Sequence, residues 1–115
     1  MNPFPVLKLD HLGIRVTNLQ LALDFYTLFY FEIDPSENLD EHQACVLIHN
    51  SGLRIKLLYN AANYQGHNVL IDAVIKYPGI THLAMQVDNM QETQKRLAKN
   101  GITITVLKCG LKWVI

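Results

Sequence analysis

This chain of 115 residues has only two cysteines, no net charge and no long apolar run. Its two cysteines, Cys45 and Cys109, fit neither a disulfide framework nor a CxxC motif. Ten basic and ten acidic residues cancel, so the basic excess that binds nucleic acid or anionic membranes is missing. No apolar run approaches the ~20 residues of a membrane-spanning helix, and the start MNPFPVLKLD does not resemble a signal peptide. We therefore predict a cytoplasmic protein that binds neither nucleic acid nor membranes.

What the chain does have is an internal repeat, and repeats decide the architecture before other signals do. The segment LDHLGIRVTNLQLALDFYTLFYFEI begins at Leu9, and ITHLAMQVDNMQETQKRLAKNGITI begins at Ile80, an offset of 71 residues. The offset places His11 on His82. It also matches four further pairs: Leu12 with Leu83, Val16 with Val87, Asn18 with Asn89, and Gln20 with Gln91. One structural unit therefore occurs twice.

Both copies have the periodicity of a strand followed by a helix. The first copy predicts these elements: a strand over 6–16, a helix over 19–30 capped by Thr17 or Asn18, and a hairpin of two strands over 42–50 and 53–60. A mostly polar linker follows over 61–78. The second copy predicts these elements: a strand over 79–87, a helix that Asp88 or Asn89 caps and Gly101 ends, and a strand over 102–108.

We expect a single α+β domain over residues 1–115, built from two βαβββ modules. Module one spans about 6–60, and module two spans 79–115. Adding the offset to the last two strands of module one gives 113–121 and about 124–131, which run past Ile115, so module two is expected to be incomplete. The strand over 79–87 would then have an open apolar edge, and such edges pair with other chains. We therefore predict a homodimer or, as the alternative, a rearranged tail in which TITVLK and LKWVI pair with this edge.

His11 and His82 are the first candidates for a functional site. If the two copies pair about a pseudo-twofold axis through their first strands, the two imidazoles approach each other, and neutral imidazole is the commonest metal ligand in proteins. Metal sites of this kind usually have three or four ligands, including a carboxylate or thiolate. Two histidines alone make a weak site and are equally explained as a remnant of a metal-binding ancestor. The other histidines, His42, His49 and His67, are expected to be solvated.

These residues resemble the vicinal oxygen chelate superfamily, which contains glyoxalases, bleomycin resistance proteins and extradiol dioxygenases. The resemblance covers about residues 7–107 and lies in four runs: HLGIRV, LALDFYT, LRIKLLYN and GITHLAMQVDN. It implies a cup-shaped mixed sheet of paired βαβββ modules, with a divalent metal (Ni, Zn or Fe) held inside the cup. It also implies chemistry in which the metal binds adjacent substrate oxygens and stabilises an oxyanion.

Within the superfamily the chain is most similar to glyoxalase I, the lactoylglutathione lyase. The resemblance assigns His11 and His82 as metal ligands, and Arg15 and Asn60 as residues that bind glutathione. Where that family has a ligand glutamate on the fourth strand, this chain has Lys56. An ammonium group about 4 Å from a divalent ion is repelled by several kcal/mol. The glutamate on the eighth strand, which is both ligand and base, has no counterpart, so no catalytic residue is assigned.

Three functions therefore compete. The first is a metal-dependent lyase or isomerase that acts on a glutathione hemithioacetal or a similar small carbonyl compound. The second is a metal-free module in which Arg15 and Lys56 help to bind a small apolar or anionic ligand. The third is an inactive truncated product.

Each substrate-binding candidate also has a simpler interpretation. Arg15 is equally explained as an exposed strand residue, Asn60 as the start of a turn, and Lys56 as a lysine that faces solvent or the cup. Tyr30 stands where the family usually has glycine, so the exit of the first helix is expected to differ.

Overall fold

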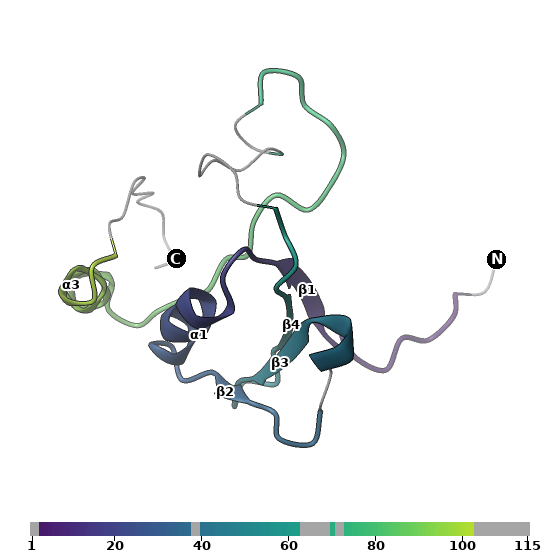
Figure 1. The fold of residues 1–115 in the computed structure, drawn as a ribbon, viewed down its shortest axis with the longest axis horizontal. Helices are drawn as coiled ribbons and strands as arrows, with labels where there is room; N and C mark the ends of the chain where they lie inside the picture. Colours follow the sequence, from purple (N-terminus) through teal and green to yellow (C-terminus); the bar gives the residue numbers. More distant parts are fainter. Residues whose placement is uncertain (1–2, 38–39, 63–69, 71–72, 103–115) are drawn as a thin grey trace. The chain divides into compact units, whose positions relative to one another are not determined.

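The computed structural model describes residues 3–37, 40–62, 70 and 73–102. The chain divides into two compact units, residues 1–65 (unit 1) and 66–115 (unit 2), and the boundary between them falls inside the predicted linker. Within the described residues, unit 1 holds a four-stranded mixed sheet with one α-helix, and unit 2 holds a second α-helix (Figure 1). The architecture is α+β, as the sequence predicts, while the single domain stays a prediction.

The sheet of unit 1 has its strands in the order β1-β4-β3-β2. The strands span Leu12–Arg15 (β1), Glu32–Ile33 (β2), Ala44–Ile48 (β3) and Arg54–Leu58 (β4). β1 pairs with β4 in parallel, and the other neighbours are antiparallel. The predicted strand over 6–16 is correct only for β1, because residues 3–11 have no ladder partner within the described part of the chain.

β3 and β4 form the predicted hairpin. The N–H of His49 donates to the carbonyl of Leu53 at 3.0 Å, and the N–H of Gly52 donates to the carbonyl of His49 at 2.9 Å. Gly52 has a φ of 97°, which residues with a Cβ rarely adopt. The turn therefore depends on the glycine that marks it in the sequence. A short 3₁₀ helix, η1 (Asp40–His42), precedes β3.

Helix α1 (Leu19–Thr27) begins where the sequence predicts it and ends earlier. The side chain of Asn18 accepts a hydrogen bond from the N–H of Leu21 at 3.0 Å, so Asn18 is the cap. The sequence predicts an apolar side of Leu19, Ala22, Leu23, Tyr26, Phe29 and Tyr30. These residues are partly buried except Tyr30, which is exposed. A stripe with this spacing is typical of a helix that packs on one face.

Helix α1 lies beside one face of the sheet of unit 1 (Figure 1), and part of the core is formed on this face. Three leucine and isoleucine side chains on this face are fully buried: Leu47, Ile55 and Leu57. Phe31 is also buried, and its ring lies 5.5 Å from the ring of Tyr26 on α1 and 4.9 Å from that of His49. Burial raises the pKa of Tyr26. The aromatic contacts therefore fix the helix to the hairpin side of the sheet.

Tyr30, where the chain leaves α1, has a left-handed backbone with a φ of 66° and a side chain that is 73% exposed. This conformation costs a non-glycine residue about 1–2 kcal/mol. We expect Tyr30→Gly to raise the free energy of unfolding by about 1 kcal/mol, because relief of the strain exceeds the added chain entropy of glycine. Urea denaturation measures the change. Tyr30→Ala is the control, since it removes the ring and keeps the strain; an equal gain in the alanine variant would contradict the backbone explanation.

Unit 2 repeats the local structure of unit 1 at the helix. Helix α3 (Met90–Lys99) is capped by Asn89, whose side chain accepts from the N–H of Glu92 at 3.0 Å, the same distance and spacing as at Asn18. The helix ends at Gly101, which has a φ of 74° and suits a C-terminal stop. The repeat that is visible in the sequence is therefore also present in the capping geometry.

The predicted strand over 79–87 is wrong, because within the described residues only Gln86 of this segment forms a β-bridge. Exposure still alternates along it in register with the first copy. His82, Ala84 and Gln86 are exposed and the residues between them are partly buried, as for His11, Gly13 and Arg15. The segment thus has one more exposed and one more buried face, as a strand does, but it lacks the backbone hydrogen bonds to a neighbouring strand. Apart from Ile102, the predicted strand over 102–108 lies outside the described residues.

Candidate functional site

The sheet face opposite Leu47, Ile55 and Leu57 carries basic side chains beside the buried Ala44 and Val46. We call it the basic face and define it by Arg15, Arg54 and Lys56. Alternation along β1 and β4 places these residues away from Ile55 and Leu57 of the core. Lys56 is half-buried on an inner strand and forms no ion pair with any described residue. The part of the chain that the structure describes therefore leaves a positive charge uncompensated at the centre of this face.

Gly13 leaves open space beside Lys56. The register pairs Gly13 on β1 with Lys56, which pairs on its other side with Val46 of β3. A Cβ placed at Gly13 would meet nothing within 4 Å, and its φ lies outside the left-handed region. Neither the backbone nor a close neighbour among the described residues requires glycine here. What this glycine provides is room on the basic face.

Arg15 and Asn60 are in contact although 45 positions separate them. The Nε of Arg15 donates a hydrogen bond to the Oδ1 of Asn60 at 3.2 Å, and both residues are exposed. Because the amide is neutral, this bond orients the guanidinium without cancelling its charge, and the two terminal nitrogens keep their donors for another partner. The structure brings together two residues that the resemblance assigns to substrate binding. Their role in binding stays a prediction.

Arg54 differs from the other two basic residues because its charge is neutralised. It forms ion pairs with Asp34 at 3.2 Å and with Glu37 at 3.6 Å. Asp34 is nearly buried and also accepts hydrogen bonds from the hydroxyl and the N–H of Ser36. These hydrogen bonds from Ser36, together with the charge of Arg54, lower the pKa of Asp34. The cluster fixes the loop after β2 to β4, so its role is structural.

His11 lies one residue before β1 and is paired with Asp10, a contact that the sequence analysis missed. Its Nδ1 lies 2.7 Å from the Oδ2 of Asp10, and 41% of the His11 side chain is exposed. A carboxylate can only accept, so Nδ1 carries the proton and the neutral imidazole has its lone pair on Nε2. The hydrogen bond from His11 lowers the pKa of Asp10, and the charges of Arg54 and Lys8 act in the same direction. The imidazole is therefore oriented, with one nitrogen free for chemistry.

The predicted metal ligands His11 and His82 lie in separate units. His82 is exposed, and its Nδ1 lies 2.8 Å from the hydroxyl of Thr81. No group of three histidine, cysteine, aspartate or glutamate side chains among the described residues has the arrangement of a metal site. Lys56 cannot serve as the carboxylate ligand of the fourth strand. The described residues therefore do not fit a metal by themselves, and a metal between His11 and His82 stays a prediction.

Two further predictions from the sequence concern single side chains. His49 is not solvated as expected, because its Nδ1 bonds to the hydroxyl and the N–H of Ser51 and its ring packs on Phe31. Cys45 is a partly buried free thiol, and burial together with the charge of Asp40 raises its pKa. A raised pKa makes a thiol less reactive, which agrees with its predicted role as a packed side chain. Cys109 and His67 lie outside the described residues.

The described residues include no helix with the length and apolar character that crossing a membrane needs. Comparison with curated proteins and with solved structures gave no match. The sequence model of one protein family does match, over residues 8–107, and this range includes His11, Arg15, Lys56, Asn60 and His82. The match covers most of the chain and both copies of the repeat. The chain therefore belongs to the Glyoxalase/Bleomycin resistance protein/Dioxygenase superfamily.

Proposed function

We propose that unit 1 binds a small carboxylate on the basic face, between Arg15 and Lys56. The observation that carries the proposal is the uncompensated charge of Lys56 beside the open space at Gly13. A half-buried ammonium without an anionic partner has lost part of its hydration, and a bound anion restores that interaction. This is the metal-free binding module that the sequence analysis gives as an alternative.

Arg15 supports a planar carboxylate as the ligand. Its Nε is engaged by Asn60, and its two terminal nitrogens form a fork that matches the two oxygens of a carboxylate. Lys56 adds a point charge that suits a further oxygen on the neighbouring carbon. The Cα atoms of Arg15 and Lys56 are roughly 8 Å apart, judged from the strand rise and spacing. Two long side chains at this separation can reach one ligand of three to five carbons, a size that we infer from that reach.

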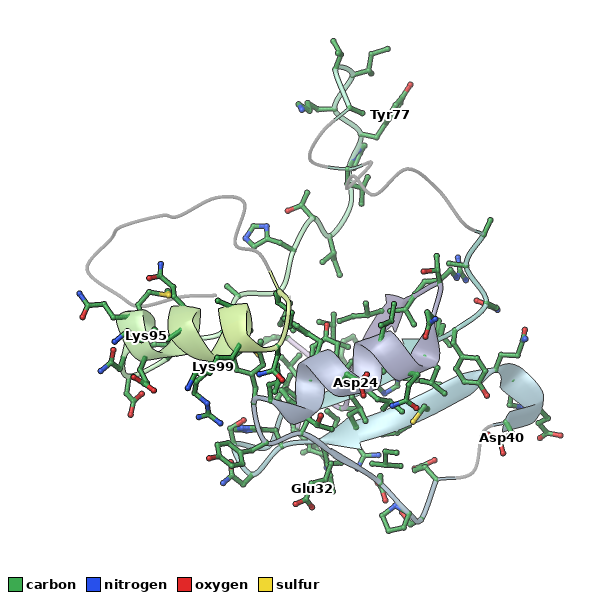
Figure 2. The ribbon with its side chains drawn as sticks, turned by 60° about the vertical axis from the view of Figure 1, so that its left-hand side comes forward. Asp24, Glu32, Asp40, Tyr77, Lys95 and Lys99 are labelled. Atoms are coloured by element: carbon green, nitrogen blue, oxygen red, sulfur yellow. The ribbon has the colours of Figure 1, made fainter. Side chains whose placement is uncertain are left out.

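Lys56→Gln tests the proposal, with 2-oxobutanoate as the probe ligand. We expect the variant to bind at least about tenfold more weakly, since a hydrogen bond to a charged group contributes about 1.5–3 kcal/mol. Isothermal titration calorimetry at constant ionic strength measures Kd. Lys95→Gln, on the exposed surface of α3 (Figure 2), removes the same charge from unit 2 and is expected to leave Kd unchanged. Equal affinity in the two variants, or no binding by the wild type, would overturn the proposal.

Several finer predictions from the sequence remain predictions. A metal-dependent lyase like glyoxalase I requires ligands beyond those in the described part of unit 1. The homodimer was inferred from a strand over 79–87 that is not formed as predicted, so its proposed edge has no geometric support in the described residues. The cytoplasmic location continues to rest on the composition of the chain alone.

A further inference from the structure

The C-terminal end of α3 carries the dipeptide Asn100–Gly101, which the binding proposed above does not use. Gly101 has a left-handed backbone with a φ of 74°, and its N–H donates to the carbonyl of Ala98 at 3.1 Å. Asn100 is exposed, and its Nδ2 donates to the carbonyl of Arg96 at 2.8 Å. The side-chain amide of Asn100 and the N–H that follows it are therefore both engaged in closing the helix.

The first copy of the repeat closes α1 with the same backbone contacts and without an asparagine. The offset of 71 residues places Phe29 on Asn100 and Tyr30 on Gly101. Three consecutive N–H groups donate to carbonyls with the same spacing at both helix ends: those of Phe29, Tyr30 and Phe31 in the first copy, and those of Asn100, Gly101 and Ile102 in the second. Tyr30 also has a positive φ, of 66°. The turn itself therefore does not require the amide of Asn100.

We infer that Asn100 is a site of spontaneous deamidation, and that the native end of α3 restrains the reaction. Glycine has no Cβ, so the backbone nitrogen of Gly101 is less hindered than that of any other residue type. No other asparagine in the sequence is followed by glycine. In the folded chain both reacting groups have other partners, the carbonyls of Arg96 and Ala98, so the helix end must open first. The site lies in unit 2 and is independent of the carboxylate binding proposed for unit 1.

Water is the only co-reactant of this modification. The backbone nitrogen of Gly101 attacks Cγ of Asn100, the amide nitrogen leaves as ammonia with the proton of the attacking N–H, and a cyclic imide forms. Water then adds to one of the two carbonyl carbons of the imide and breaks the bond from that carbon to the nitrogen. Addition at Cγ gives aspartate. Addition at the main-chain carbon gives isoaspartate, in which the chain runs through Cγ.

Neither product can restore the helix end. A carboxylate at position 100 has no proton to donate to the carbonyl of Arg96, and its charge lies at the negative end of the helix dipole. Isoaspartate adds a carbon to the main chain, so the N–H groups of Gly101 and Ile102 no longer match the carbonyls that they bond in the native helix end. The modification is therefore one-way, and α3 loses its C-terminal turn as the chain ages.

Peptide mapping by mass spectrometry of the full chain, after incubation at neutral pH, tests the inference. Aspartate and isoaspartate at position 100 are expected to form at least about tenfold faster in urea that unfolds the chain than in buffer, because the helix end must open before the reaction. Asn50 is the control within the same sample, since it is exposed at the hairpin turn but precedes a serine. Equal rates for Asn100 in urea and in buffer, or a rate in urea no greater than that of Asn50, overturn the inference.

Two variants separate the chemistry from its effect on the helix. Asn100→Gln keeps an amide on a longer side chain, and it is expected to abolish conversion at position 100 and to leave hydrogen exchange of the Gly101 N–H unchanged. Asn100→Asp reproduces one product, and it is expected to speed this exchange at least about threefold. Conversion that persists at position 100 in Asn100→Gln overturns the site. Exchange in Asn100→Asp that is as slow as in the wild type overturns the loss of the helix end.

Discussion

Leu57→Ala is expected to destabilise unit 1 by about 2–5 kcal/mol, the usual cost of truncating a buried leucine. Leu57 is fully buried on β4, an inner strand, and pairs with Ile14 of β1 and Cys45 of β3. The substitution removes apolar contacts and leaves a cavity between sheet and helix. Urea denaturation followed by circular dichroism measures the loss, and a variant without a cooperative transition lies at the upper end of the range.

Leu21→Ala is the control for this prediction. Leu21 lies in α1 with 67% of its surface exposed, and the chemical change is the same. Exposed substitutions usually change stability by less than about 0.5 kcal/mol. If the two leucines cost the same, the assignment of the core face to Leu57 is wrong, and with it the assignment of Lys56 to the opposite face.

Gly13→Val is expected to weaken 2-oxobutanoate binding at least about tenfold without loss of stability. The new side chain fills the space beside Lys56, where a Cβ meets nothing within 4 Å in the described structure. Valine also favours a strand over glycine by up to about 1 kcal/mol, so the melting temperature should stay the same or rise. Calorimetric titration gives Kd, and differential scanning fluorimetry gives the melting temperature.

The combination of outcomes separates a binding role for Gly13 from a structural role. A lower melting temperature would mean that Gly13 is needed for packing, for example against residues outside the described part of the chain. Unchanged affinity with unchanged stability would mean that the ligand does not use the space at Gly13. Gly52→Val, at the hairpin turn with a φ of 97°, is the control in which strain lowers stability first.

Local signals in the sequence predict the helices and the hairpin of this chain. Asn18 and Asn89 cap the two helices because a short side-chain oxygen reaches the N–H three residues on. Gly52 and Gly101 mark the turn and the helix end because both adopt positive φ. These signals act within a few residues, so they are visible without knowledge of the fold.

Contacts between strands are less visible in the sequence. Alternation over 79–87 predicts two faces, and both are present, but a strand also needs a partner, which alternation does not supply. The same limit applies to residues 6–11, where the predicted strand lacks a ladder within the described residues. Periodicity therefore describes the side chains of a segment better than its hydrogen bonds.

The candidate site was predicted in part. The resemblance assigned Arg15 and Asn60 separately, while their contact depends on the parallel pairing of β1 with β4. Asp10 was missed because adjacent residues of a strand face opposite sides, which argues against a contact with His11. That argument fails where the chain has not yet entered β1. The position of Arg54 on the basic face could have been predicted, since it lies two residues before Lys56 in the same strand and therefore on the same face.

The parallel pairing of β1 with β4 joins the first and last strands of unit 1, with α1, β2 and β3 between them in the chain. Loop-closure entropy delays contacts between such distant segments during folding. During synthesis on the ribosome, the basic face cannot form until the chain through Asn60 has emerged. A ligand that binds to the basic face would therefore stabilise only those chains in which β4 has already paired with β1.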